Sequence, residues 1–388
     1  MKSSKDPIIL KQIKSIFKLI SVFSPKLSFS DRFNVLKALL TNQVSGASPL
    51  IKKFEEELAD RFDRKYAVVL SNGSAALDVS LQSLNLKKDD EVIVPSFAII
   101  SCLSAIIRTG ATPIFCDVDI ETWNMSLEHV KDKVSPKTKA VLMVHLYGLT
   151  ADAKKIEDYC NEKNLILIED AAEAHGQSTD NKKCGSFGRL STFSFYANKH
   201  ITTGEGGAVL TDNKEDYEKI KKMINLDFDN SRRFQHENLY WNYRLSGIQA
   251  ALGLSQIKSL EKTIQKKRKQ GQIYNSLFKK NEDFNIPVDD FNGVKNHYWV
   301  YGILLKSENI RDKVTNELLE KGIQTRPFFW PLHLQNALDL KFKNNNELKN
   351  SEFLGRNGFY IPLGEHLNIN KQKFIAKNLI EIVEQYNN

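Results

Sequence analysis

The chain has 388 residues, of which 41% are hydrophobic and 26% are charged. These values are typical of a globular protein with one large or two moderate domains, and they exclude a small scaffold that depends on disulfides. The net charge of +8 favours anionic partners in general. Because basic residues are interleaved with acidic ones, as in residues 52–65, we expect no nucleic-acid partner.

The cysteines predict neither a disulfide framework nor a zinc site. They are Cys102, Cys116, Cys160 and Cys184. They are scattered along the chain, form no CxxC pair and have no histidines at metal-ligand spacing. This usage fits a reducing compartment, so we expect a cytoplasmic protein.

Residues 1–30 differ from the rest of the chain. Asp6 and Pro7 resemble a helix cap and a first helical position, and isoleucines recur at helical spacing over residues 9–20. Lysines interrupt this short apolar stretch and no cleavage site follows, so a signal peptide and a transmembrane helix are disfavoured. We expect an amphipathic helical extension that packs on the body or on a second subunit, while weak association with a membrane surface stays open.

Apolar strand candidates alternate with helical segments from about residue 64. The candidates are YAVVLS (66–71), EVIVPS (91–96), TPIFCDV (112–118), AVLMVHLYG (140–148), LILIED (165–170), LSTFSFYA (190–197) and AVLTD (208–212). Such alternation builds a parallel sheet. We therefore predict an α/β fold with a mostly parallel sheet of about seven strands in residues 31–250.

A smaller lobe is expected after this sheet. A long helical stretch from about Ser246 to Lys280 leads to HYWVYGILL, IQTRPFF and FYIPL, which have the pattern of strands between helices. Residues 251–388 are therefore predicted to form the linking helix and a small α+β domain.

Polar residues follow several predicted strands, where open parallel sheets bind their ligands. Asn72 and Gly73 open a helix directly after the first strand, and a helix start of this kind suits a phosphate. Asp170 ends a later strand, where a carboxylate can hold a protonated ring nitrogen, although an acid there is often only a cap. A metal site of Asp170, Glu173 and His175 matches no specific spacing, and we expect none.

Lys199 lies within the segment FSFYANKHITTGEGG (193–207). Apolar walls and nearby cations lower a lysine pKa toward that of a nucleophilic amine, the condition for a Schiff base. A phosphate-binding helix start, a strand-end aspartate and a downstream lysine together match what pyridoxal 5'-phosphate requires. The sequence therefore predicts this cofactor.

From about Leu40 to the C-terminus, ordered blocks resemble the DegT-related nucleotide-sugar aminotransferases, a branch of the fold type I pyridoxal-phosphate enzymes. The blocks include NGSAALDVSL, DDEVIVPSF, GATPIFCDVD, IEDAAEAHG, FSFYANKHITTGEGGAVLTD, WNYRLSGIQAALGLSQI and RPFFWPLH. Within the family, the chain is most similar to GDP-perosamine synthases. The resemblance implies a three-layer, aspartate aminotransferase-like fold and a homodimer with shared active sites. It also implies amino transfer from L-glutamate to a nucleotide-linked 4-keto-6-deoxyhexose for surface polysaccharide or O-antigen biosynthesis.

The resemblance also assigns roles to residues. Lys199 is expected to bond to the cofactor and to carry protons, and Asp170 to stay ionised against the pyridinium nitrogen. The remaining cofactor-binding residues are expected to be Gly73, Ser74, Ala75, Ile99, Glu173, Ser194 and, reaching the neighbouring subunit's phosphate, Asn242. Arg326 and His333 belong to a block that lies near the sugar nucleotide in relatives.

Some alternatives stay open at this point. Ile99 stands where relatives carry an aromatic that stacks on the cofactor, so stacking is aliphatic or comes from Phe97. The acceptor could be a UDP- or dTDP-linked sugar, could be aminated at C3, or could lack a nucleotide. Related sugar 3-dehydratases have histidine at the position of Lys199, which favours transamination here. The competing class is a catalytically silent, membrane-associated interaction protein, against which Lys199 and Asp170 argue.

Overall fold

The structure is a computed structural model that describes residues 19–25, 27–228, 231, 233–339, 342 and 347–387. The amphipathic helix predicted over residues 9–20 therefore lies almost wholly outside the described residues. No helix in the described ranges combines the length and the hydropathy that crossing a membrane requires.

Seven of the described strands form one large sheet. They are β1 (Tyr66–Leu70), β2 (Glu91–Pro95), β3 (Thr112–Cys116), β4 (Thr138–Val144), β5 (Ile166–Asp170), β8 (Leu190–Ser194) and β9 (Gly207–Thr211), in the spatial order β1-β9-β8-β5-β4-β2-β3. Only β9 runs antiparallel to its neighbours β1 and β8. The predicted mostly parallel sheet of about seven strands is confirmed.

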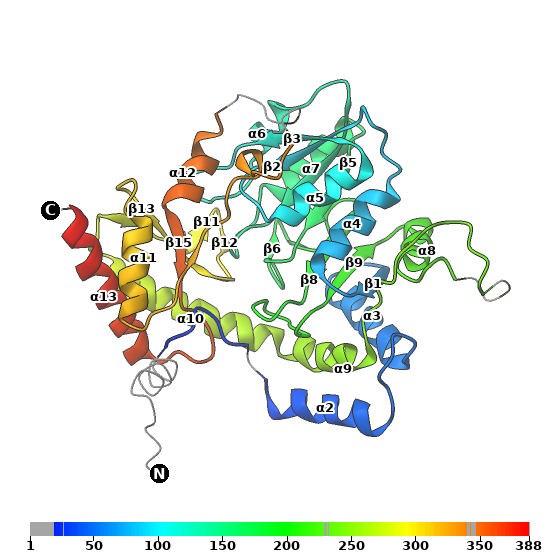
Figure 1. Cartoon of the computed structure of the whole chain (residues 1–388), viewed down its shortest axis with the longest axis horizontal. Helices are drawn as coiled ribbons and strands as arrows, with labels where there is room; N and C mark the ends of the chain where they lie inside the picture. The colour runs from blue at the N-terminus through cyan, green and yellow to red at the C-terminus, as the bar shows by residue number, and fades with distance from the viewer. Residues whose placement is uncertain are drawn as a thin grey trace, which may run out of the picture.

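Helices cover both faces of this sheet (Figure 1). They are α2 (Phe29–Leu40), α3 (Pro49–Arg61), α4 (Gly73–Ser83), α5 (Ile100–Thr109), α6 (Leu127–Lys131), α7 (Ala153–Glu162), α8 (Lys214–Met223) and α9 (Gly247–Gln256), with the short strands β6 (Ser178–Thr179) and β7 (Lys182–Lys183) between α7 and β8. Successive side chains of a strand point to opposite faces. In β1, Val68 therefore packs with α4 and α8, whereas Val69 packs with α3 and α9.

The C-terminal lobe has its own sheet and core. Its elements are η1 (Ile257–Ser259), α10 (Leu260–Phe278), β10 (Phe284–Asn285), β11 (Asp290–Phe291), β12 (Val294–Lys295), β13 (Tyr301–Leu305), α11 (Arg311–Glu320), β14 (Arg326–Pro327), η2 (Leu332–Leu334), α12 (Lys349–Asn357), β15 (Gly358–Ile361) and α13 (Ile369–Asn387). The sheet is antiparallel in the order β10-β13-β15-β14. Helix α10 leads into this lobe (Figure 1).

The chain before α2 lies against the C-terminal lobe. The N–H of Ile20 donates to the carbonyl of Gly322 at 2.8 Å, and the N–H of Gln324 donates to the carbonyl of Ile20 at 3.0 Å. The N–H of Leu363 donates to the carbonyl of Val22 at 3.1 Å. Helix α2 begins at Phe29, close to the predicted boundary at residue 30. The division into segments 1–30, 31–250 and 251–388 stays a prediction.

Candidate active site

A cavity of about 420 Å³ lies at the carboxyl ends of β4, β5 and β8, between the large sheet and the C-terminal lobe. Nine of the residues singled out in the sequence line it, namely Asn72, Gly73, Ser74, Ile99, Asp170, Glu173, Ser194, Lys199 and Arg326. Ala75, Asn242 and His333 are not part of this lining. Residues more than 250 positions apart in the sequence therefore meet in one pocket.

Lys199 lies in the turn between β8 and β9, and its side chain is 9% exposed. Its Nζ is 3.3 Å from Oε1 of Glu173 and 3.8 Å from the ring centroid of Trp299. A carboxylate and an indole face both attract an ammonium group. The amine of Lys199 is thus held inside the cavity by two contacts from different lobes.

Asp170 is buried at the end of β5. Its Oδ1 accepts the N–H of Ala172 at 3.0 Å, and its Oδ2 accepts the thiol of Cys102 at 3.6 Å. Burial raises the pKa of this carboxyl, which the charge of Lys199 partly offsets. No ion pair recorded among the described residues includes Asp170, so a protonated ring nitrogen in the cavity fits this carboxylate.

The start of α4 forms a corner of the cavity that suits a phosphate. The side chain of Asn72 caps the helix by accepting the N–H of Ala75 at 2.8 Å. The N–H groups of the first turn have no partners within the helix and face an anion favourably. A Cβ on Gly73 would lie 2.7 Å from Cβ of Ser194, so glycine lets the serine approach this corner.

Glu173 is the partner of Lys199 on the cavity wall. Its Oε2 accepts the N–H of Tyr147 at 3.1 Å. Burial raises the pKa of Glu173 to about 7, because desolvation outweighs the attraction of Lys199. The carboxyl can therefore hold or release a proton near neutral pH.

Three sequence-based assignments lie elsewhere. His333 is buried, with its Nδ1 2.6 Å from Oγ of Ser96 and its Nε2 3.4 Å from Glu352. Asn242 is exposed on the surface, and Ala75 belongs to the first turn of α4 beside the cavity. Of the two candidates for stacking, Ile99 lines the cavity. Phe97 is instead packed in the core against aromatic neighbours.

Several cavity residues were not predicted from the sequence. They are Ser101, Tyr196, Asn198, Glu205, Trp299, Phe329 and Tyr360. Tyr196 and Asn198 adjoin Lys199 in the chain, so proximity to the lysine could have indicated them. Trp299 and Tyr360 lie in apolar stretches of the C-terminal lobe and have the pattern of core residues, so only the packing of the lobes places them here.

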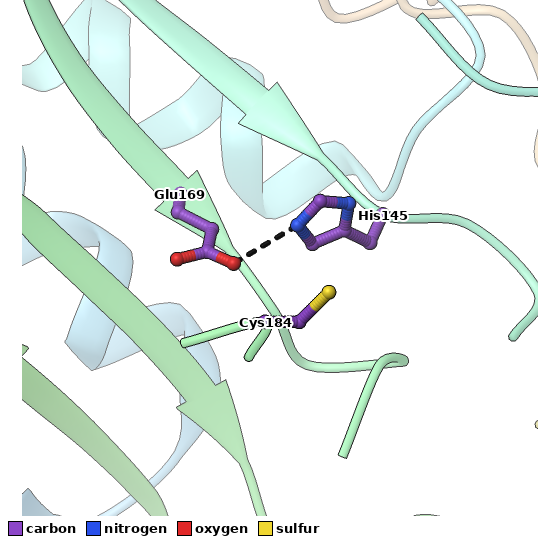
Figure 2. Close-up of side chains that lie close together, drawn as sticks. All are labelled: His145, Glu169 and Cys184. Atoms are coloured by element: carbon purple, nitrogen blue, oxygen red, sulfur yellow. Dashed lines mark hydrogen bonds and ion pairs between the residues drawn. The ribbon is translucent and has the colours of Figure 1, made fainter. Parts of the chain in front are cut away.

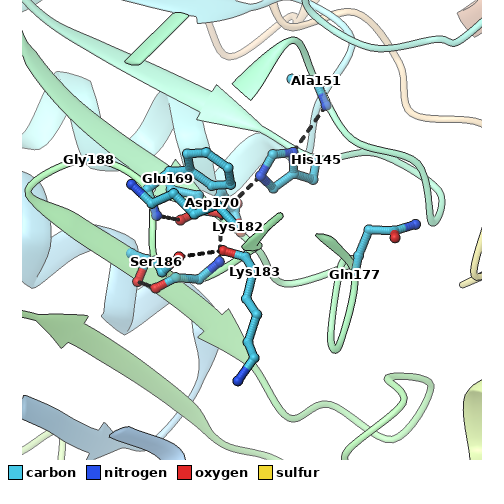
Figure 3. A network of polar contacts seen from close by, with 12 residues as sticks. His145, Ala151, Glu169, Asp170, Gln177, Lys182, Lys183, Ser186 and Gly188 are labelled. Atoms are coloured by element: carbon cyan, nitrogen blue, oxygen red, sulfur yellow. Dashed lines mark hydrogen bonds and ion pairs between the residues drawn. The ribbon is translucent and has the colours of Figure 1, made fainter. Parts of the chain in front are cut away.

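A buried polar cluster lies on the other face of β5 and was also missed. It consists of His145, Glu169 and Cys184, whose ligand atoms all lie within 4.8 Å of one another (Figure 2). Nε2 of His145 is 2.9 Å from Oε1 of Glu169, and Nδ1 of His145 accepts the N–H of Ala151 at 3.1 Å (Figure 3). The histidine proton therefore belongs on Nε2, and the imidazole donates to the carboxylate.

Glu169 anchors the strand end that carries Asp170. Besides the histidine, its oxygens accept the N–H groups of Gly185 at 2.6 Å and Phe187 at 2.8 Å. The N–H of His145 donates to the carbonyl of Asp170 at 3.1 Å. The ring nitrogens of His145 and the carboxylate oxygens of Glu169 all have partners in the protein, so the cluster fits a structural role that holds Asp170 in place.

Three histidines near Lys199, of which His175 and His200 are buried and His297 is half-buried, should make the protein sensitive to acid. Burial lowers the pKa of His175 to about 3 and of His297 to about 4, and lowers that of His200 strongly. In the unfolded chain these histidines have the ordinary pKa of 6.5, so below this pH the unfolded chain binds protons that the folded protein does not. The free energy of unfolding is therefore highest above pH 6.5 and decreases as the pH falls. At about pH 5, each histidine that stays neutral should reduce the free energy of unfolding by about 2 kcal/mol.

Thermal unfolding measured from about pH 8 to about pH 5 tests this expectation. The midpoint should fall steeply below the ordinary histidine pKa, and His297→Gln should flatten the profile. The exposed His236 provides the matched control, since His236→Gln should leave the profile unchanged. A wild-type midpoint that is constant over this range would contradict the prediction.

Comparison with known proteins gives the family. Residues 29–380 match the DegT/DnrJ/EryC1/StrS aminotransferase family. The chain is 36% identical over 365 residues to GDP-perosamine synthase of Escherichia coli O157:H7, covering 94% of this chain and 98% of that protein. It is 30% identical to dTDP-4-dehydro-2,3,6-trideoxy-D-glucose 4-aminotransferase of Saccharopolyspora spinosa, covering 95% of this chain and 98% of that protein.

A solved structure shows the same architecture. The Helicobacter pylori aminotransferase PseC, involved in the biosynthesis of pseudoaminic acid, superposes with a TM-score of 0.89 at 26% identity, over 95% of this chain and 100% of that one. The three-layer fold of the fold type I enzymes is thereby confirmed. The chain belongs to the DegT/DnrJ/EryC1/StrS aminotransferase family and is a sugar aminotransferase that depends on pyridoxal 5'-phosphate.

Proposed function

We propose that this enzyme transfers the amino group of L-glutamate to C4 of a GDP-linked 4-keto-6-deoxyhexose for surface polysaccharide or O-antigen biosynthesis. The observation that carries the proposal is the cavity in which Lys199, Glu173 and Asp170 meet, in a chain 36% identical to a GDP-perosamine synthase over nearly its full length. The reading as a catalytically silent interaction protein is set aside, because the chain is an aminotransferase.

The proposed roles follow from the chemistry of each group. When bound, pyridoxal phosphate supplies an electron sink for the carbon that loses its proton. Asp170 would hold the ring nitrogen through its buried carboxylate, and Lys199 would move a proton between the two reacting carbons. The N–H groups of Gly73 and Ser74 and the hydroxyl of Ser194 would bind the phosphate, whereas the N–H of Ala75, which the sequence also suggested, is donated to the side chain of Asn72. Ile99 would border the ring.

Glu173 would keep Lys199 oriented between proton transfers. Its Oε1 lies 3.3 Å from Nζ of Lys199, and its other oxygen is fixed by a backbone N–H. Because burial raises the pKa of Glu173 to about 7, this carboxyl can be charged or neutral near neutral pH. Arg326, at the cavity rim, would bind an anionic group of the substrate, and His333 would support that rim from behind.

The absorption spectrum of the purified protein tests the donor half of the reaction. With added pyridoxal phosphate, we expect the visible band of the lysine-bound cofactor, and this band should bleach when L-glutamate is added. A panel of GDP-, dTDP- and UDP-linked keto sugars should then restore the band with the true acceptor. A band that glutamate leaves unchanged would contradict the proposed donor, and restoration by a dTDP-linked sugar alone would contradict the GDP-linked acceptor.

A homodimer with shared active sites is proposed from an exposed apolar stripe on α2. Phe29, Phe33, Leu36 and Leu40 are 83%, 54%, 50% and 75% exposed and recur at helical spacing. The opposite face of α2 is bonded to α9, for example from Gln256 to Asp31. Apolar side chains that form a continuous exposed face on a helix mark a protein interface. In such a dimer, Asn242 would reach the phosphate of the neighbouring subunit.

A charge in this stripe should dissociate the dimer. Leu36→Glu would place a carboxylate in an apolar interface, where an unpaired charge is costly. We expect the molar mass measured by light scattering to fall from that of two chains to that of one. Leu319→Glu provides the control, because Leu319 is 53% exposed on α11, away from the stripe. A Leu36→Glu protein that stays dimeric would overturn the proposed interface.

We propose a cytoplasmic location. All four cysteines are free and buried, a state that fits a reducing compartment.

A further inference from the structure

Residues 20–25 precede the stretch that matches the family, which begins at residue 29, yet they end beside the active site. Figure 1 shows this dark blue segment against the C-terminal lobe, before the chain enters α2. Besides its backbone bonds to that lobe, the N–H of Val22 donates to Oε1 of Gln324 at 3.0 Å, and Nε2 of His366 lies 2.7 Å from the carbonyl of Ser21. Val22 is only 2% exposed. The segment is therefore held firmly on both sides up to Val22.

The next residue, Phe23, contacts two residues of the active-site wall. Its ring meets the ring of Tyr196 edge to face, with the centroids 6.3 Å apart and the planes at 65°. The guanidinium carbon of Arg326 lies 4.9 Å from the centroid of the Phe23 ring. Tyr196 and Arg326 both line the cavity, so Phe23 supports this part of the wall from outside.

Arg326 is the cation best placed to receive an anionic substrate. Among the described residues that line the cavity, the cations are Lys199 and Arg326, and Lys199 is committed to the cofactor. Arg326 begins the short strand β14, where it pairs with Tyr360 of β15. Burial raises the pKa of Tyr360 to about 12, and the charge of Arg326 is the main effect that opposes this rise.

Arg326 is nevertheless exposed, so its position depends on the rings around it. An arginine side chain samples many rotamers when nothing restrains it, and binding a ligand must then order it. An aromatic face attracts a guanidinium group and restricts it to one plane. Phe23 supplies such a face and is itself fastened through the preceding residues of the segment.

We propose that Phe23 is a positioning residue for substrate binding, holding the Arg326 guanidinium ready for an anionic group of the substrate. That group is a carboxylate of the amino donor or the diphosphate of the sugar nucleotide. The inference rests on the proposed function, because it takes Arg326 as a substrate-binding residue. It gives the N-terminal segment a part in substrate affinity.

Two substitutions of Phe23 distinguish the effect of its aromatic face from the effect of its apolar bulk. Phe23→Leu keeps an apolar side chain and removes the aromatic face, whereas Phe23→Trp keeps a face for the guanidinium. Phe374→Leu is the matched control, because Phe374 is 45% exposed on α13, outside the cavity. The holoenzyme is titrated with L-glutamate, followed by the absorption of the bound cofactor, and separately with GDP, followed by calorimetry.

We expect Phe23→Leu to lower the affinity for one of the two probes by about 3- to 30-fold, which is the range expected for the loss of a cation–π contact. Phe23→Trp and Phe374→Leu should bind like the wild type, and the spectrum before titration should be unchanged in all three. A lower affinity for glutamate alone identifies the carboxylate as the ligand of Arg326, and a lower affinity for GDP alone identifies the diphosphate.

A double-mutant comparison excludes a general loss of structure. In an Arg326→Ala background, Phe23→Leu should have no further effect, because its effect passes through the arginine. Equal weakening in both backgrounds, or a Phe23→Leu protein that binds both probes like the wild type, overturns the inference while the proposed function stands. If glutamate does not change the cofactor absorption of the wild-type holoenzyme, the proposed donor is contradicted instead, and the GDP titration alone then tests the inference.

Discussion

Replacing Lys199 with alanine is expected to abolish amino transfer. The side chain is the amine in the cavity that Glu173 and Trp299 hold in place, and no other lysine lines the described part of this pocket. Loss of a positioned acid–base group alone lowers rates by about 10²- to 10⁴-fold, and the proposed covalent link to the cofactor would be lost as well. We expect turnover below the detection limit of a coupled assay with glutamate and keto sugar.

Cofactor binding should survive this change, because the phosphate corner and Asp170 remain. Equilibrium dialysis with pyridoxal phosphate should therefore show bound cofactor without the visible band of the wild type. Lys52→Ala is the control, since Lys52 has an 82% exposed side chain on α3 and should keep full activity. Wild-type turnover by the Lys199→Ala protein would disprove the proposed role.

Asp170→Asn should reduce both turnover and cofactor affinity while keeping the shape of the site. The amide oxygen can still accept the N–H of Ala172, which lies 3.0 Å from the carboxylate, but the negative charge is gone. A ring nitrogen then has no buried anion to keep it protonated, and the electron sink weakens. Removing one such electrostatic contact costs about 10²- to 10³-fold in turnover, which steady-state kinetics would measure.

Thermal unfolding separates this effect from a loss of stability. Burial raises the pKa of Asp170, so its ionised form is costly in the absence of the cofactor, and an uncharged asparagine removes that cost. The Asp170→Asn protein without cofactor should unfold at the wild-type temperature or above, and adding pyridoxal phosphate should stabilise it less than the wild type. Asp158→Asn on the surface of α7 should match the wild type in every measurement. A variant with wild-type rate and affinity would refute the electrostatic role.

The sheet could be predicted because its signals are local. In β5, Ile168 packs on the α4 and α5 side of the sheet and Leu167 packs on the α7 side. Continuing this alternation by two residues places Glu169 and Asp170 on opposite faces. The short-range pattern of a strand therefore determines that Asp170 faces the cavity, and the phosphate corner follows from a helix that starts directly after β1.

The remainder of the site could not be predicted from local pattern. Trp299 and Phe23 lie in apolar stretches whose spacing indicates only burial. His333 belongs to the same sequence block as Arg326, so both residues were predicted to lie near the sugar nucleotide. In the structure, Arg326 belongs to β14 and lines the cavity. His333 belongs to the short helix η2, and its ring is hydrogen-bonded to Ser96 and Glu352 instead.

The sequence by itself determined the fold class and the cofactor and predicted Lys199 and Asp170 as site residues, because strand periodicity and the motifs around these two residues are local signals. Only the tertiary structure decided which residues complete the pocket. Trp299, Arg326 and Tyr360 come from a separate lobe, and Phe23 comes from a segment that hydrogen-bonds to that lobe from the other end of the chain. Packing between lobes depends on long-range burial and hydrogen bonding, which leave no periodic signal in the sequence.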